Sequence, residues 1–281
     1  MIATPARAGE LHTRATGMAV ESVESTQAPA GARHPRVQPE PAPRQDERHA
    51  GSPRDGVRAV GARGIAAVLV VSLLFLPVYL SRIGAPDIVG DDEAREVGII
   101  QDMFVRGRWL LPRFNDTTFP DKPVLYHWLG AAACALGPSC DERAVRLPSA
   151  LSAIALVGLT CIGAARLFDG TTGVTATLLL GLTPVLFQWG RSARPDVLLT
   201  LLVTGALLVF HDWWRDGARS PARATALGIL LGLGVLAKGP VAPAIAMLTI
   251  AAFLCARGDL RLLRRLSAAH VLLHFALLGL G

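Results

Sequence analysis

Long apolar runs constrain this chain more than any other feature of its sequence. Of the 281 residues, 51% are hydrophobic and only 18% are charged, whereas charged residues make up about 25% of soluble domains. The apolar residues gather in runs of roughly 14 to 20, a length nearer to a membrane-spanning helix than to a buried strand. We therefore predict an all-α polytopic membrane protein.

Seven apolar runs are predicted to span the membrane. The first, residues 64–80, follows a tail that is too long for a signal peptide, and no small-x-small cleavage site comes after it, so a signal anchor is favoured. No charged flank or soluble domain follows the last run, and from this we expect a chain truncated at its C-terminus, with weak or no enzymatic activity in this form. The other six predicted spans are residues 147–165, 172–189, 196–210, 224–237, 240–254 and 266–281.

Residues 1–62 precede the predicted membrane module, which covers residues 63–281. This first segment is rich in Ala, Pro, Arg, Glu and Gln and shows no apolar periodicity. Such a composition buries too little apolar surface to offset the entropy of ordering, so we predict a disordered tail. Its arginines favour a cytoplasmic location under the positive-inside rule.

The segment between the first two predicted spans, residues 81–146, is expected to be the first external loop. Its apolar stretch 124–137 is short for a span, and we interpret it as a juxtamembrane helix. If residues 124–137 do not cross the membrane, most arginines of the short loops are cytoplasmic. The charged loop, the Arg191–Asp196 turn and the Lys238–Pro240 turn then share the external face of the inner (plasma) membrane.

Charge and cysteine content limit the possible partners. The formal net charge is +6, but many arginines flank apolar runs, where membrane lipids with anionic headgroups explain them better than nucleic acid does. The four cysteines form no CxxC pair, which argues against a thiolate metal site. Cys134 and Cys140 could be bridged in an oxidising compartment, but their spacing does not establish a disulfide and we do not expect one.

Acidic and basic residues concentrate between residues 90 and 123, far more densely than an ordinary loop of a membrane protein requires. We infer that this segment forms one wall of an active site at a membrane surface. Five short motifs stand out there and further along the chain: Asp92-Glu93-Ala94-Arg95, Gly107 to Pro112 (GRWLLP), Phe119 to Pro123 (FPDKP), Arg194-Pro195-Asp196 and Lys238-Gly239-Pro240.

Taken together, these motifs resemble the polytopic GT-C glycosyltransferases that use polyprenyl-phosphate sugars, and most closely the branch of lipid A aminoarabinose transferases and protein O-mannosyltransferases. The resemblance covers roughly residues 64–281. It implies a GT-C-like helical module, a polyprenyl-phosphate-linked sugar donor, a lipid or protein acceptor, and an inverting transfer. The chain departs from the family pattern at Asp121, where the family has Glu, and at Val124, where a second proline is usual.

The predicted transfer needs fixed positive charge. A sugar leaving polyprenyl phosphate develops positive charge at its anomeric carbon and negative charge on the phosphate, and fixed cations lower that barrier. Lys122 is the strongest candidate cation, with Arg95, Arg194 and Lys238 as helpers. The 28 basic residues include only two lysines, and both lie in the matched motifs.

Carboxylates supply the remaining predicted roles. Asp92 is the candidate general base for an acceptor hydroxyl; if the acceptor is a phosphate, Asp92 would instead orient the sugar or balance the cations. Glu93 and Asp196 are predicted to contact substrate. Asp121 is predicted to bind sugar hydroxyls or a divalent cation, although two carboxylates so far apart are a poor metal signature without a third ligand.

Simpler interpretations apply to several of the same charges. We expect Asp91, Glu96 and Asp102 to be solvated charges on a helix face, and His127 to pack among interfacial aromatic rings. Lys122 could also be a lysine that extends from the membrane to the interface. The alternative function is a non-catalytic membrane protein that binds or transports a lipid phosphate.

Overall fold

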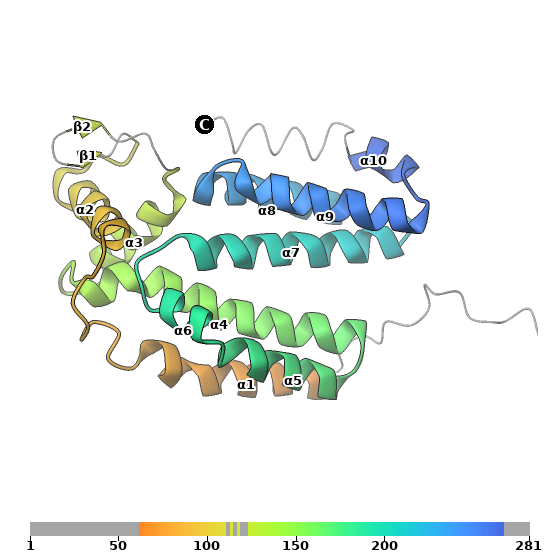
Figure 1. The fold of residues 1–281 in the computed structure, drawn as a ribbon, viewed down its shortest axis with the longest axis horizontal. Helices are drawn as coiled ribbons and strands as arrows, with labels where there is room; N and C mark the ends of the chain where they lie inside the picture. Colours follow the sequence, from red (N-terminus) through yellow and green to blue (C-terminus); the bar gives the residue numbers. More distant parts are fainter. Residues whose placement is uncertain (1–61, 111–112, 115–116, 119–122, 267–281) are drawn as a thin grey trace, which may run out of the picture. The chain divides into compact units, whose positions relative to one another are not determined.

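The computed structural model describes residues 62–110, 113–114, 117–118 and 123–266 (Figure 1). Almost all of the predicted tail and of the last predicted span therefore lies outside the described residues. The helices are α1 (Ala62–Leu80), α2 (Asp91–Arg106), α3 (Leu125–Leu136), α4 (Glu142–Leu167), α5 (Gly170–Gly181), α6 (Pro184–Gly190), α7 (Asp196–Arg215), α8 (Pro221–Lys238), α9 (Val241–Arg257) and α10 (Arg261–Leu266).

The prediction of an all-α architecture is confirmed. The only strands in the described part of the chain are β1 (Arg113–Phe114) and β2 (Thr117–Thr118), an antiparallel pair of two residues each. Both lie in the charged segment after α2. Every other described element is helical, as expected for a chain that must satisfy its backbone hydrogen bonds inside a membrane.

Three described helices, α4, α7 and α8, are long and apolar enough to cross a membrane. The predicted span over residues 172–189 is not one continuous helix, because the chain bends by 64° between α5 and α6. Pro184 begins α6, and a proline has no backbone N–H to continue the preceding helix and disfavours helical geometry at the residue before it. The bent pair counts as a fourth span if it is taken as one. The chain is an integral membrane protein.

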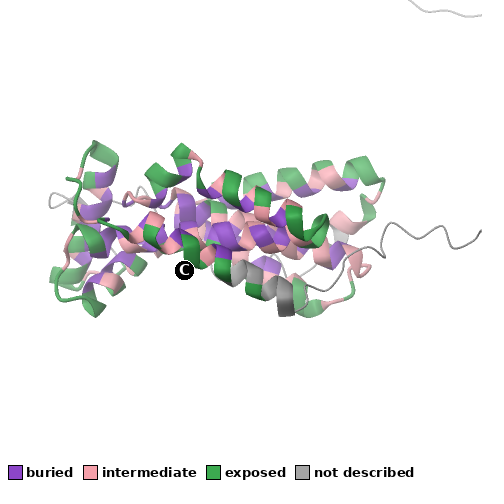
Figure 2. Cartoon of the chain, turned by 90° about the horizontal axis from the view of Figure 1, so that it is seen from below, coloured by how far each residue is buried: buried purple, intermediate pink, exposed green. Residues whose placement is uncertain are grey.

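Helix α4 is the centre of the packing. It contacts α1, α3, α5, α6 and α7, while α8 and α9 pack on α7. Figure 2 shows the buried residues on the faces where helices meet and the exposed residues on their outer faces. In α1 the rings of Phe75 and Tyr79 are buried, and the Tyr79 hydroxyl donates to Gly181 O at 3.0 Å. These contacts fix α1 against α4 and α5.

The apolar stretch 124–137 forms α3, so the predicted short helix is confirmed. Its 12 residues correspond to about 18 Å, well short of the roughly 30 Å of a hydrocarbon core. Helix α3 packs against α2 through Gly130, where an added Cβ would lie 2.5 Å from Ile100 Cδ1. The small size of glycine at this position therefore sets how closely the two helices approach.

Cys134 and Cys140 form a disulfide between the end of α3 and the residues before α4, contrary to our expectation of free thiols. The intervening Gly137-Pro138-Ser139 turn reverses the chain and brings the two Cα atoms within 4.4 Å. Sequence spacing could not show this, because it depends on how sharply the chain turns between two helices that pack together.

Candidate active site

Three segments that are far apart in the sequence meet at one end of the helices. They are the start of α2, the turn between α6 and α7, and the turn between α8 and α9, which lie at the end where α3 is found (Figure 1). Ion pairs join the first to the second and the second to the third. The predicted gathering of these charged motifs is confirmed, and it defines a polar cluster of five residues: Asp92, Arg95, Arg194, Asp196 and Lys238.

The Asp92 carboxylate lies at the centre of the first half of the polar cluster. Its Oδ2 is 3.5 Å from Arg194 Nη1 and its Oδ1 is 3.8 Å from Arg95 Nη1. The Asp92 side chain is 53% exposed. Such exposed ion pairs add at most about 1 kcal/mol to stability. These ion pairs therefore contribute little to the stability of the fold.

Asp196 and Lys238 form the second half of the polar cluster. Asp196 opens α7 and Lys238 closes α8, positions where each charge also suits the helix dipole. The Lys238 ammonium donates to Asp196 Oδ1. Gly239 then turns the chain with a φ of 69°, and an added Cβ there would lie 4.0 Å from Pro123 Cγ. The Lys238 turn thus lies beside the residue that follows Lys122.

Asp121 and Lys122 themselves lie outside the described residues. The roles predicted for them, as a sugar or metal ligand and as the main phosphate-binding cation, stay predictions. Among the described residues, no three or more His, Cys, Asp or Glu side chains gather in an arrangement that could hold a metal ion.

Glu93 points away from the surface, which differs from its predicted contact with substrate. It is buried, and its Oε1 accepts hydrogen bonds from Arg146 Nε at 2.8 Å and from the backbone N–H of Ala193 at 2.8 Å. The Arg146 guanidinium is 2% exposed. Sequence reasoning missed this buried pair, since it assigned no role to Arg146 and grouped Glu93 with its exposed neighbour Asp92.

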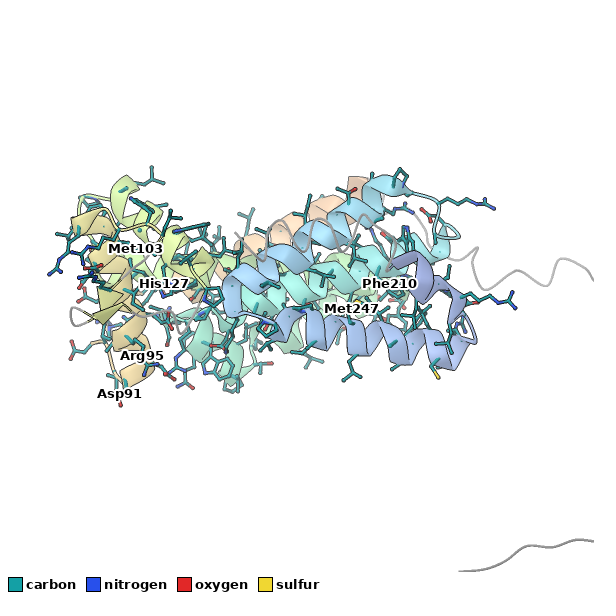
Figure 3. The ribbon with its side chains drawn as sticks, turned by 90° about the horizontal axis from the view of Figure 1, so that it is seen from above. Asp91, Arg95, Met103, His127, Phe210 and Met247 are labelled. Atoms are coloured by element: carbon teal, nitrogen blue, oxygen red, sulfur yellow. A yellow bond between two sulfur atoms is a disulfide. The ribbon has the colours of Figure 1, made fainter. Side chains whose placement is uncertain are left out.

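Glu96 corrects a further prediction. Its side chain and that of His127 are only 1% exposed, and His127 Nε2 lies 2.6 Å from Glu96 Oε2, so Glu96 is not a solvated charge on a helix face. His127 packs edge-on against the Tyr126 ring, with ring centroids 6.4 Å apart. Figure 3 shows His127 on α3, close to α2, whose Arg95 and Asp91 it also labels. A signal was present in the sequence. Glu96 lies three or four residues from Ile99 and Ile100 on the apolar face of α2, where solvent does not reach.

Asp102 is also less solvated than predicted. Its side chain is 10% exposed, with Arg106 Nε at 3.5 Å and Arg108 Nη1 at 3.8 Å. Its Oδ2 accepts a hydrogen bond from the backbone N–H of Arg113 at 3.1 Å, which ties β1 to α2. Asp91, in contrast, is exposed as expected.

The backbone of Arg194 is held by a pair of hydroxyl groups, those of Ser149 and Tyr126. Ser149 Oγ of α4 donates to Arg194 O at 2.9 Å and accepts from Arg194 N at 3.3 Å. The Tyr126 hydroxyl of α3 lies 2.8 Å from the same Ser149 oxygen and donates to Val145 O at 3.1 Å. Burial, more than any other influence, raises the pKa of Tyr126 above its usual range, so this hydroxyl stays neutral and keeps its proton for the network.

An apolar pocket of about 710 Å³ lies between α3 and α4. Leu129, Leu136, Leu147 and Leu151 are among the side chains that line it, and none of the five residues of the polar cluster does. The pocket and the polar cluster are therefore separate features. The lining suits hydrocarbon, as expected between membrane-embedded helices.

The sequence is similar to one known protein family and to characterised sugar transferases. The family model described as dolichyl-phosphate-mannose-protein mannosyltransferase matches residues 121–280. An undecaprenyl phosphate-alpha-4-amino-4-deoxy-L-arabinose arabinosyl transferase of Shewanella sediminis is 27% identical over 194 residues, which cover 68% of this chain and 35% of that protein. Its counterpart in Yersinia pestis is 28% identical over 188 residues, covering 64% and 33%. The chain thus spans about a third of the length of these curated relatives.

Solved structures share the fold. The crystal structure of ArnT from Cupriavidus metallidurans in the apo state matches with a TM-score of 0.68 at 22% identity, covering 78% of this chain and 41% of that one. The structure of the same protein bound to undecaprenyl phosphate matches with a TM-score of 0.67 at 23% identity, covering 76% and 40%. The membrane-embedded helical architecture is therefore common to both proteins.

Proposed function

The chain belongs to the dolichyl-phosphate-mannose-protein mannosyltransferase family, and on that premise we propose that it acts as a membrane glycosyltransferase. It moves a sugar from a polyprenyl-phosphate donor to a lipid or protein acceptor at the external face of the plasma membrane. The observation that carries this proposal is the polar cluster, in which the carboxylate of Asp92 contacts Arg95 of its own helix and Arg194 from a distant segment of the chain. The names of the relatives support the choice of a polyprenyl-phosphate donor.

In the proposed reaction, the cations of the polar cluster act on the donor phosphate. Arg95, Arg194 and Lys238 each contact a carboxylate, so an arriving phosphate takes the place of a carboxylate as their partner. Lys122 is the residue directly before Pro123, which lies beside the Lys238 turn. We include Lys122 among these cations in the proposal. Fixed cations of this kind stabilise the charge that develops on a leaving phosphate.

Asp92 then acts as the general base. The acceptor oxygen attacks the anomeric carbon as the bond from that carbon to the phosphate oxygen breaks, and the electron pair of the broken bond leaves with polyprenyl phosphate. The acceptor proton passes to Asp92, whose carboxylate is released when the phosphate engages Arg194. A single in-line displacement of this kind inverts the configuration at the anomeric carbon.

The disulfide supports the external location. Cys134 and Cys140 are bridged at the end of α3, and disulfides persist in oxidising compartments but are rare in the cytosol. Helix α3 packs against α2, which begins with Asp92 and its neighbours. This supports our proposal that the polar cluster lies on the external side, with the N-terminal tail on the cytoplasmic side.

Transfer from polyprenyl-phosphate sugars in membranes that contain the full chain tests the proposal. Asp92→Asn should lower the rate about 10²- to 10⁴-fold, the usual contribution of a general base. Asp91→Asn removes an equally exposed carboxylate one residue away and should leave the rate unchanged. Native rates in Asp92→Asn would exclude the catalytic role. Donor binding by the native chain without any transfer would instead favour the alternative, a lipid-phosphate binding protein.

A further inference from the structure

The start of α2 and the α6–α7 turn contact each other twice, at two depths. At the surface, Asp92 Oδ2 lies 3.5 Å from Arg194 Nη1. Inside the protein, Glu93 Oε1 accepts a 2.8 Å hydrogen bond from the backbone N–H of Ala193. Glu93 directly follows Asp92, and Ala193 directly precedes Arg194. The inner contact therefore joins the immediate neighbours of the two residues that form the outer one.

The outer contact is too exposed to set this geometry by itself. The Asp92 side chain is 53% exposed and that of Arg194 is 29% exposed, and long, solvated side chains are held only weakly by such a pair. Glu93, in contrast, is 4% exposed. A charge-assisted hydrogen bond shielded from water is both shorter and stronger than a neutral one, so the inner contact can fix where the turn lies.

Arg146 holds the Glu93 carboxylate in place. Its Nε donates to Glu93 Oε1 at 2.8 Å, and its Nη1 donates to the carbonyl oxygens of Ile83 at 3.0 Å and Pro86 at 2.7 Å. Its Nη2 donates to Asp87 O at 3.1 Å. A guanidinium has five N–H groups in a rigid fork, and four of them are used here. Arg146 thus connects the central helix α4 with both the loop before α2 and α2 itself.

We propose that Glu93 and Arg146 are positioning residues, which hold the α6–α7 turn against α2 so that Arg194 lies beside Asp92. The catalytic meaning of this rests on the proposed function, in which Arg194 binds the donor phosphate and Asp92 is the base. The geometric claim does not depend on the reaction. Glu93 acts through its neighbours and touches no substrate.

Chemical cross-linking measures this geometry without sugar transfer. Asp92→Cys and Arg194→Cys form one reporter pair, joined by a short reagent with two thiol-reactive ends. Asp196→Cys and Lys238→Cys form a control pair between α7 and α8, and no described contact of Glu93 or Arg146 involves those two residues. The free cysteines, Cys161 and Cys255, are replaced by Ala, and the native disulfide is kept.

Each reporter pair is then combined with Glu93→Gln or with Arg146→Lys. Glu93→Gln keeps the size of the side chain but leaves the Arg146 charge buried without an anion. Arg146→Lys keeps the charge but loses the fork that reaches several partners at once. We expect each change to slow cross-linking of the 92–194 pair by about tenfold, because that reaction requires the two thiols to be held close together. Cross-linking of the 196–238 pair should proceed at its original rate.

Two results would overturn the proposal. If the 92–194 pair cross-links at the native rate in both variants, the buried pair does not position the turn. If both reporter pairs fail together, Glu93 and Arg146 support the whole fold and do not position one turn. The transfer assay is independent of these outcomes, since an inactive native chain would reject the proposed function and leave the cross-linking result intact.

Discussion

His127 Nε2 on α3 lies 2.6 Å from Glu96 Oε2 on α2, and both side chains are buried. This contact joins the two short helices that carry the charged segment, at the level of their apolar core. A buried polar group is costly unless another polar group lies beside it. Stability of this part of the protein therefore depends on both partners.

Removing one partner of this pair should destabilise the protein strongly. We expect Glu96→Ala or His127→Ala to lower the free energy of unfolding by about 1–3 kcal/mol, the usual cost of removing one partner of a buried polar contact. Thermal unfolding of the detergent-solubilised protein measures the change. Asp91→Ala, an exposed carboxylate on the same helix, serves as the control and should change little. A native melting temperature in both buried variants would contradict the assignment.

The contact between Gly130 and Ile100 predicts a steric effect. Gly130→Ala places a Cβ 2.5 Å from Ile100 Cδ1, and overpacking of this kind costs about 1–3 kcal/mol. Gly170→Ala is the matched control, because nothing lies within 4 Å of its added Cβ. It should keep or raise the melting temperature. Combining Gly130→Ala with Ile100→Val, which removes the Cδ1 atom, should restore part of the lost stability.

Asp169 predicts a dependence of stability on acid pH. Its carboxylate accepts hydrogen bonds from the backbone N–H of Thr172 at 2.8 Å and from the hydroxyl of the same residue at 3.1 Å. The backbone hydrogen bond is the main reason why the pKa of Asp169 is lowered. A lowered pKa in the folded state means that the contribution is present above the ordinary Asp pKa of about 3.9. It is lost as the pH falls through the lower folded-state value.

Melting temperatures measured between neutral and acid pH test the role of Asp169. Native protein should lose the contribution of Asp169 on acidification, whereas Asp169→Asn, whose amide oxygen still caps α5 and does not titrate, should show a flatter profile. Identical pH profiles for the two proteins would show that this carboxylate is not linked to folding.

Lys238 predicts an effect on catalysis at the second half of the polar cluster. Lys238→Ala should lower the rate of sugar transfer about 100-fold, the usual loss when one fixed donor to developing charge is removed. Lys238→Arg keeps the charge and should retain more of the rate. Arg257, which lies 5.2 Å from the centre of the Trp214 ring and outside the polar cluster, provides the control. Equal rates in Lys238→Ala and Arg257→Ala would remove Lys238 from the site.

The disulfide predicts both stability and orientation. Replacing Cys134 and Cys140 with Ala should destabilise the protein by about 2 kcal/mol, given the short loop that the bridge closes. In intact cells, a membrane-impermeant thiol reagent should label these cysteines only after treatment with an impermeant reductant. Labelling that requires cell lysis would place the disulfide, and the polar cluster near it, on the cytoplasmic side.

Local patterns in the sequence were sufficient for much of the site. Asp92, Arg95, Arg194, Asp196 and Lys238 were all predicted from short motifs, and the structure brings them together as ion pairs. Grouping was predictable because alternating apolar runs oblige every second turn to lie at the same membrane surface. The individual contacts were not predictable, since hydropathy does not indicate which turns are neighbours in the folded protein.

The amino-acid sequence by itself determined the membrane-embedded helical class and the set of charges available to the site, because apolar runs and ionisable groups are properties of the residues themselves. Only the tertiary structure decided that Glu93 and Glu96 turn inward, that α5 and α6 bend apart, and that Cys134 meets Cys140. Each of these depends on which surfaces pack together. A carboxylate on α2 faces solvent or a buried arginine according to the helix that covers it.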